Sequence, residues 1–105
     1  MIHHVTYSQL SEAVTKAGFE EMIRASRTWL LKIPEVLSIR SGRNTDQQSQ
    51  WQFFYSIEVD SLEKLAMVKS DAHYLKFQEA YIKGNVEHQF EMNFELDPSR
   101  DLKYS

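Results

Sequence analysis

Cysteine is absent from this sequence of 105 residues, and glycine and proline are scarce, at three and two residues. Without cysteine the chain can form neither disulfides nor thiolate metal sites, and it has no thiol nucleophile. Gly18, Gly42 and Gly84 are isolated, which excludes a glycine-rich phosphate-binding loop, and no serine stands in a nucleophile elbow. We therefore expect neither nucleotide-dependent nor serine-hydrolase chemistry, and a fold stabilised by packing alone.

Long apolar runs are also missing, and the first residues lack the basic and apolar regions of a signal peptide. The net charge of −3 provides no broad positive field for nucleic acid. The sequence thus predicts a cytoplasmic protein with no membrane or nucleic-acid partner. Its length fits one domain, expected at residues 1–98 and followed by a C-terminal tail at 99–105.

Apolar periodicity predicts the secondary structure. Period-two runs indicate four strands, and three- and four-residue spacing indicates two helical regions, the second divided into two pieces. The first helix is expected to begin near Thr15 and stop near Ile33, before Pro34. Asp60 with Glu63 is expected to cap the start of the second helical region. Ser70 or Asp71 is expected to cap the second piece of that region, and Gly84 to end it. The predicted strands are Ile2–Ser8, Val36–Arg43, Trp51–Val59 and Val86–Leu96.

The last strand has the clearest alternation. One of its faces has His88, Phe90, Met92, Phe94 and Leu96, and the other has Glu87, Gln89, Glu91, Asn93 and Glu95. The strand that begins at Trp51 has an equally apolar face, so we expect the helices to cover the apolar faces of both strands. The polar side chains would then line the second face of the sheet.

This order, β-α-β-β-α-β, predicts an α+β, ferredoxin-like fold: an antiparallel sheet with the helices on one face. In the first strand, Ile2, His4, Thr6 and Ser8 should share one face, and His3, Val5 and Tyr7 the other.

Four local patterns make the chain resemble the stress-responsive dimeric α/β-barrel (Dabb) family over nearly its whole length. They are Met1-Ile2-His3-His4-Val5, with His4 the matching histidine; Ile33-Pro34; the run Ser38 to Asn44; and Asp71-Ala72-His73 with Phe77.

The resemblance implies a homodimer in which two sheets pair face to face as a barrel. Because the face expected to lie inside is rich in glutamate, either a hydrated interface helped by Ser99 to Ser105, or weaker dimerisation, would follow.

Family resemblance also suggests chemistry, because a minority of members cyclise polyketide-like substrates with two histidines that match His4 and His73. The accompanying tyrosines do not match, since Ser26 and Met67 stand in their places. His73 lies in the first turn of a helix, where the dipole favours a neutral imidazole that can act as a general base, with His4 stabilising the enolate. Tyr55, Tyr74, Phe77 and Tyr81 are the candidate substrate-binding residues of an aromatic pocket between sheet and helices.

Each candidate also has a purely structural interpretation. His73 would cap its own helix, His4 would be a hydrogen-bonded strand histidine, and the aromatic stripe would be core. The four histidines do not have the spacing of a metal site, so neither a metal nor another cofactor is expected.

Three functions stay open: a dimer that binds a small aromatic or polyketide-like molecule, with His4 and His73 as catalytic residues; a non-catalytic stress or assembly protein; and a cofactor-free monooxygenase of the antibiotic-biosynthesis type.

Overall fold

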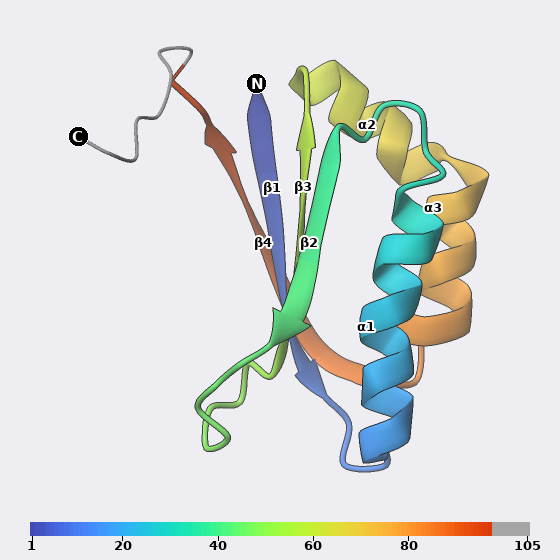
Figure 1. The fold of residues 1–105 in the computed structure, drawn as a ribbon, viewed down its shortest axis with the longest axis vertical. Helices are drawn as coiled ribbons and strands as arrows, with labels where there is room; N and C mark the ends of the chain where they lie inside the picture. The colour runs from blue at the N-terminus through green and yellow to red at the C-terminus, as the bar shows by residue number, and fades with distance from the viewer. Residues whose placement is uncertain (98–105) are drawn as a thin grey trace.

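A computed structural model describes residues 1–97, in which a four-stranded antiparallel sheet has all its helices on one face (Figure 1). The expected tail at 99–105 and the last residue of the expected domain 1–98 lie outside the described residues. Along the chain the elements are β1 (Ile2–Leu10), α1 (Lys16–Leu30), β2 (Ser38–Arg43), β3 (Phe53–Val59), α2 (Leu62–Ser70), α3 (Ala72–Phe77), the π-helical turn η1 (Gln78–Ile82) and β4 (Val86–Glu95).

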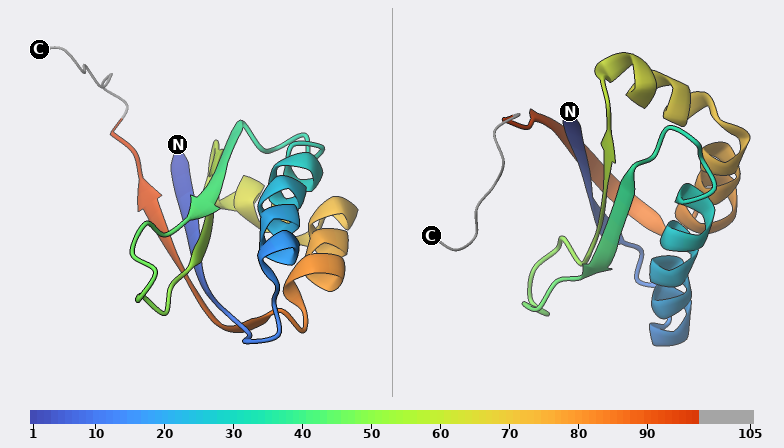
Figure 2. Two further views of the ribbon diagram at one scale, coloured as in Figure 1. Left: turned by 60° about the horizontal axis from the view of Figure 1, so that its bottom comes forward. Right: turned by 45° about the horizontal axis from the view of Figure 1, so that its top comes forward.

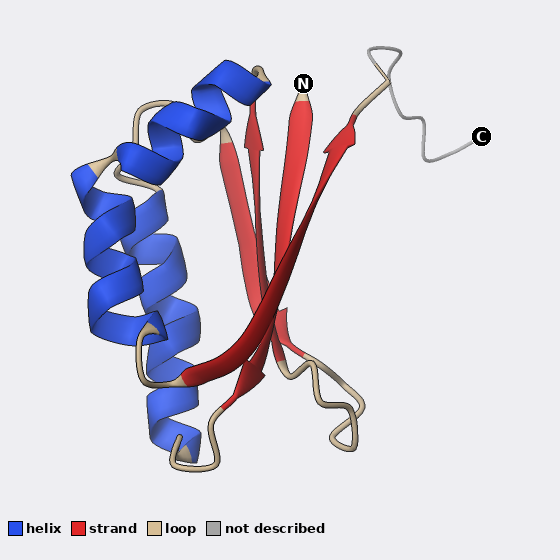
Figure 3. Cartoon of the chain, turned by 180° about the vertical axis from the view of Figure 1, so that it is seen from behind, coloured by secondary structure: helices blue, strands red, loops and turns tan. Residues whose placement is uncertain are grey.

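The strand order in the sheet is β2-β3-β1-β4. Each helical region thus connects two strands that run parallel with a third strand between them, which is the ferredoxin-like arrangement expected from the sequence. Figure 3 shows the sheet from behind, with the long edge strand β4 crossing the neighbouring strand β1.

The helix boundaries follow local capping chemistry. The helix α1 begins where expected, and Thr15 is its N-cap, whose hydroxyl accepts a hydrogen bond from the Gly18 N–H. The helix ends at Leu30, before the expected Ile33, which is buried in the following turn. For α2 the expected capping by Asp60 is wrong: Ser61 is the N-cap and accepts from the Lys64 N–H.

The second helical region also has the expected break and end. Asp71 caps α3 by accepting from the His73 N–H. Gly84 has a φ of 85°, a left-handed conformation that glycine adopts at little cost, and this turn leads the chain into β4.

The core lies between the sheet and the helices. The face of β3 with Phe53, Tyr55, Ile57 and Val59 is fully buried there, as its alternation predicted. The helical regions contribute one aromatic side chain, that of Phe77, and the aliphatic side chains of Met22, Ile23, Leu30, Leu65, Val68 and Ile82 to this layer.

The orientation expected for the last strand is wrong. Ile2 pairs with Val59 on one side and with Glu95 on the other, and His4 likewise pairs with Ile57 and Asn93. Directly opposed residues point to the same face of a sheet, so the polar residues of β4 lie on the helix side. They are Gln89, Glu91, Asn93 and Glu95.

The apolar residues of β4 consequently lie on the open face, which no described helix covers (Figure 2). Phe90, Met92 and Phe94 are 39%, 39% and 48% exposed there. Tyr7 stacks on Phe90 at 5.0 Å between ring centroids, and Trp51, outside β3, meets the same ring edge-on at 4.7 Å. The expected glutamate-rich inner face is thus replaced by an exposed aromatic patch.

Candidate functional site

The centre of the candidate site is His4, which β1 directs toward the helices and which is fully buried. Its Nδ1 lies 2.6 Å from Asn93 Oδ1, and its Nε2 lies 3.2 Å from Thr6 Oγ1. Because an amide oxygen can only accept, Nδ1 is the nitrogen with the proton. The lone pair of Nε2 therefore accepts from the Thr6 hydroxyl and is the basic position of the ring.

A chain of hydroxyl groups continues from Thr6 into the core. The phenol of Tyr55, next to Thr6 across the sheet, hydrogen-bonds with Thr6, Tyr74 and Gln78. The Gln78 amide donates to this phenol at 3.2 Å. All of these buried polar groups have partners, as a stable interior requires.

The position of Gln78 depends on a local irregularity of the helix. It is the first residue of η1, a π-helical turn that directly follows α3. Such turns rotate the following side chains relative to a regular α-helix and occur frequently at functional sites. Here the turn coincides with the residue that binds the Tyr55 phenol.

On its solvent side, His4 faces a charged pair. Glu91 Oε2 lies 3.7 Å from His4 Nε2, and Glu91 Oε1 accepts from Lys69 Nζ at 2.5 Å. The side chains of Glu91 and Lys69 are 36% and 37% exposed, whereas that of His4 is 1% exposed. A molecule that reaches Nε2 from solvent therefore has to displace this pair.

Burial determines the protonation state of these groups. It lowers the pKa of His4 below its ordinary value, against the opposing effects of the Asn93 hydrogen bond and the Glu91 charge. Burial also raises the pKa of Tyr55, and it raises that of Tyr74, which in addition contacts Tyr55. The site at neutral pH thus combines a neutral imidazole with two protonated phenols.

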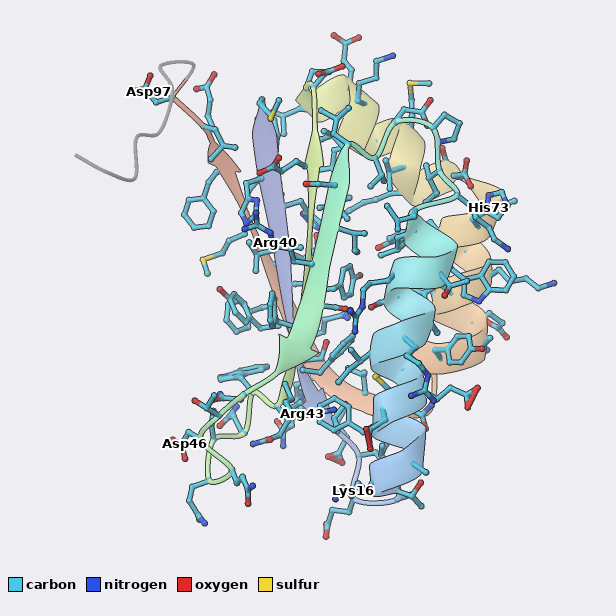
Figure 4. All side chains as sticks on the ribbon, viewed as in Figure 1. Lys16, Arg40, Arg43, Asp46, His73 and Asp97 are labelled. Carbon is cyan, nitrogen blue, oxygen red and sulfur yellow. The ribbon has the colours of Figure 1, made fainter. Side chains whose placement is uncertain are left out.

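The structure places His73, the second expected catalytic histidine, away from this network. Its Nδ1 lies 3.0 Å from Asp71 Oδ1, and its ring lies 6.1 Å from that of Trp29. Figure 4 shows the side chain on the helical layer, away from the sheet, and it is 41% exposed. The N-cap is Asp71, so His73 does not cap its own helix.

Of the four expected substrate-binding residues, two lie in the His4 network and two lie outside it. Tyr55 and Tyr74 belong to the His4 network, whereas Phe77 is fully buried core and meets Tyr55 edge-on at 5.7 Å. Tyr81 stacks on Phe77 and lines a cleft of about 160 Å³ on the outside of the helices, beside Trp29.

The site is completed by five residues for which no site role was predicted from the sequence: Thr6, Lys69, Gln78, Glu91 and Asn93. The alternation of the first strand places Thr6 on the same face as His4, so its position beside His4 could have been predicted from the sequence. The polar alternation of β4 was visible as well, but only the register of β4 against β1 brings Asn93 and Glu91 to His4.

Several hollows of the surface lie away from His4. Three of them, with volumes of about 290, 390 and 420 Å³, surround Arg43 near the β2–β3 hairpin. Neither His4 nor His73 lines any of these three.

Residues 1–97 contain no group of three or more histidine, aspartate and glutamate side chains arranged to hold a metal ion. No helix in the same range combines the length and the apolar character needed to cross a membrane.

The His4 environment predicts how stability depends on pH. The folded pKa lies below the unfolded value of about 6.5, so the unfolded state binds more protons between these two values. The contribution of His4 is fully present above about pH 6.5 and is lost as pH falls below it, by at most about 1.4 kcal/mol per pH unit. Urea unfolding from pH 7.5 to 5 should show a shallower loss in His4→Gln than in the wild type.

The matched control is His3→Gln, because His3 neighbours His4 but lies on the open face. His4 remains in this variant, so its loss of stability below about pH 6.5 should stay steeper than that of His4→Gln. Equal slopes for His4→Gln and the wild type would contradict the burial of a neutral His4.

The fold and the His4 network define an α+β, ferredoxin-like domain with a histidine between sheet and helices. Residues 2–96 match the family model of the stress responsive A/B barrel domain, Dabb, so the chain belongs to this family. No match to a curated protein sequence was found.

Solved structures agree on the fold. A Dabb family protein from Mesorhizobium loti has a TM-score of 0.78 at 16% identity, covering 90% of this chain and 95% of its own. A dimeric ferredoxin-like protein of unknown function from Thermobifida fusca has a TM-score of 0.81 at 18% identity, covering 90% of each chain. The hydroxynitrile lyase of Passiflora edulis has a TM-score of 0.78 at 11% identity, covering 95% of this chain and 96% of its own.

Proposed function

We propose that this protein is a homodimeric α/β-barrel that binds a small aromatic or polyketide-like molecule between sheet and helices, where His4 transfers a proton. The observation that best supports the proposal is the buried His4, whose Nδ1 is fixed by Asn93 and whose basic Nε2 points toward a partly exposed charged pair. The Asn93 contact fixes the ring tautomer, and the Glu91 carboxylate beside Nε2 would stabilise a protonated ring.

The groups around His4 suit removal of a proton from carbon next to a carbonyl. His4 Nε2 would take the proton, and the electron pair would move onto the carbonyl oxygen as an enolate. Lys69 is the nearby donor for that oxygen, because its ammonium group has two further protons beside the one shared with Glu91. Glu91 would stabilise the imidazolium that forms, because its carboxylate lies beside Nε2.

Two relatives support parts of the proposal. The protein from Thermobifida fusca is dimeric, and this chain exposes an aromatic patch on the face of the sheet that a barrel encloses. The Passiflora edulis protein is a hydroxynitrile lyase, so in that protein the same fold supports catalysis.

The test measures hydrogen–deuterium exchange at the central carbon of a β-diketone, acetylacetone, with and without the protein. We expect the protein to accelerate exchange, and His4→Gln to lose about 100-fold or more of the acceleration, the range of general-base catalysis. His3→Gln should keep it. In parallel, ring signals of His4 in NMR spectra should shift on addition of resorcinol.

No acceleration by the wild-type protein, or equal losses in both variants, would overturn proton transfer by His4. If neither probe moved the His4 signals, ligand binding at this site would be overturned too, and the non-catalytic assembly protein would be the better description.

A further inference from the structure

Arg43 lies at the end of β2, where two adjoining hollows of about 390 and 420 Å³ separate the β2–β3 hairpin from the start of α1. Both hollows are lined by Lys16, Phe19, Arg43 and Gln47. We call this space the Arg43 groove. Figure 4 shows Lys16 on the first turn of α1 and Arg43 on the strand side. None of these residues belongs to the His4 network.

The groove has an excess of positive charge. Glu20 is the only acidic residue among those lining the two hollows, and its contact with Arg43 is a single one of 3.7 Å between side chains that are 44% and 57% exposed. Such an exposed single contact is weak. Lys16 has no ion-pair partner among residues 1–97. The carboxylate of Asp46, on the hairpin, accepts from the Gln48 N–H within its own turn.

The walls of the groove are partly aromatic. The Arg43 guanidinium lies 5.9 Å from the centroid of the Phe19 ring, which in turn meets Phe53 edge-on at 6.0 Å. The aliphatic parts of Lys16 and Arg43 add further apolar surface. A ligand in this space would therefore find a flat apolar surface beside two cations.

The hairpin side of the groove is fixed before any ligand arrives. Asn44 donates to the Trp51 carbonyl at 2.9 Å and accepts from the Asp46 N–H at 2.8 Å. The Gln52 amide donates to the Ser49 carbonyl within the same hairpin. Because these bonds hold the chain that follows Arg43, binding would cost little ordering of the backbone.

We propose that the Arg43 groove binds a small aromatic carboxylate. The carboxylate would replace Glu20 as the partner of Arg43, in the two-pronged geometry that guanidinium groups favour, with Lys16 as the second cation. The aromatic ring would pack on Phe19. This is a second ligand site, independent of the proton transfer proposed at His4.

The experiment is an NMR titration of the full chain with benzoate, followed through the backbone amides of Phe19, Arg43 and Gln47. Benzoate should bind. Benzamide has the ring without the charge and should bind at least about tenfold more weakly. Acetate has the charge without the ring and should also bind more weakly than benzoate. Arg43→Gln should weaken benzoate binding about tenfold. Arg27→Gln, the same change near the other end of α1, should leave it unchanged.

Three results would each overturn the proposal: equal affinities for benzoate and benzamide, no effect of Arg43→Gln on benzoate binding, or no shifts of these amide signals. Equal affinities for benzoate and acetate would overturn the part of the proposal that places the aromatic ring on Phe19. The side chain of Arg43 is largely exposed, so loss of folding does not complicate its substitution. His4→Gln should bind benzoate like the wild type, which separates failure at the Arg43 groove from failure at the His4 site.

Discussion

Phe94→Glu is expected to convert the proposed homodimer into monomers at micromolar concentration. Phe94 is 48% exposed on the open face of the sheet, beside Met92 and the stacked pair of Tyr7 and Phe90. Patches of this kind on a soluble protein mark interaction sites. A glutamate there would stand opposite His3, which already faces Glu58, and its charge would have to lose its water when two sheets pair, so the dissociation constant should rise at least about 100-fold.

Analytical ultracentrifugation measures this effect directly. Gln89→Glu is the matched control, because it puts the same charge on the same strand but on the helix side, and it should remain a dimer. A wild-type protein that is monomeric at these concentrations, or a Phe94→Glu variant that stays dimeric, would show that the patch is not the dimer interface.

Phe77→Ala should destabilise the protein by about 3–5 kcal/mol, a large share of the total stability of a domain of this size. Phe77 is fully buried, where it meets the ring of Tyr55 edge-on and stacks on Tyr81. Truncation removes these contacts and leaves a cavity beneath the helices. Urea unfolding at pH 7.5 provides the measurement.

Leu75→Ala is the control for Phe77→Ala. It lies on the same helix but is 53% exposed, so it should cost less than about 1 kcal/mol. A loss below about 1.5 kcal/mol for Phe77→Ala, or equal losses for the two variants, would show that Phe77 is not a core anchor.

Much of the fold could be predicted from local patterns. The alternation of β3 identified its buried face, because one side of that strand is almost wholly apolar. The turn at Gly84 and the cap at Asp71 were likewise predictable, since each depends on the conformational preference of a residue at its own position. The choice of Asp60 over Ser61 failed because both residues are good N-caps, and only the backbone geometry selects one.

The candidate site was only partly predictable. His4 was predicted from the family resemblance, and Tyr55 and Tyr74 from the aromatic composition of their elements. Pairing His4 with His73 relied on a family pattern, whereas the structure directs His73 toward Trp29 and Asp71. Its direction depends on how α3 packs against α1, a contact between segments far apart in the chain.

The sequence by itself determined the element order, the ferredoxin-like fold, the family and the alternation of the last strand, because these depend on local periodicity and residue type. Only the tertiary structure decided which face of β4 meets the helices. Period two separates two faces but does not say which layer covers each, and here the pairing of His4 with Asn93 decides it. That one register places Glu91 and Asn93 against the buried histidine and leaves Phe90, Met92 and Phe94 exposed on the open face.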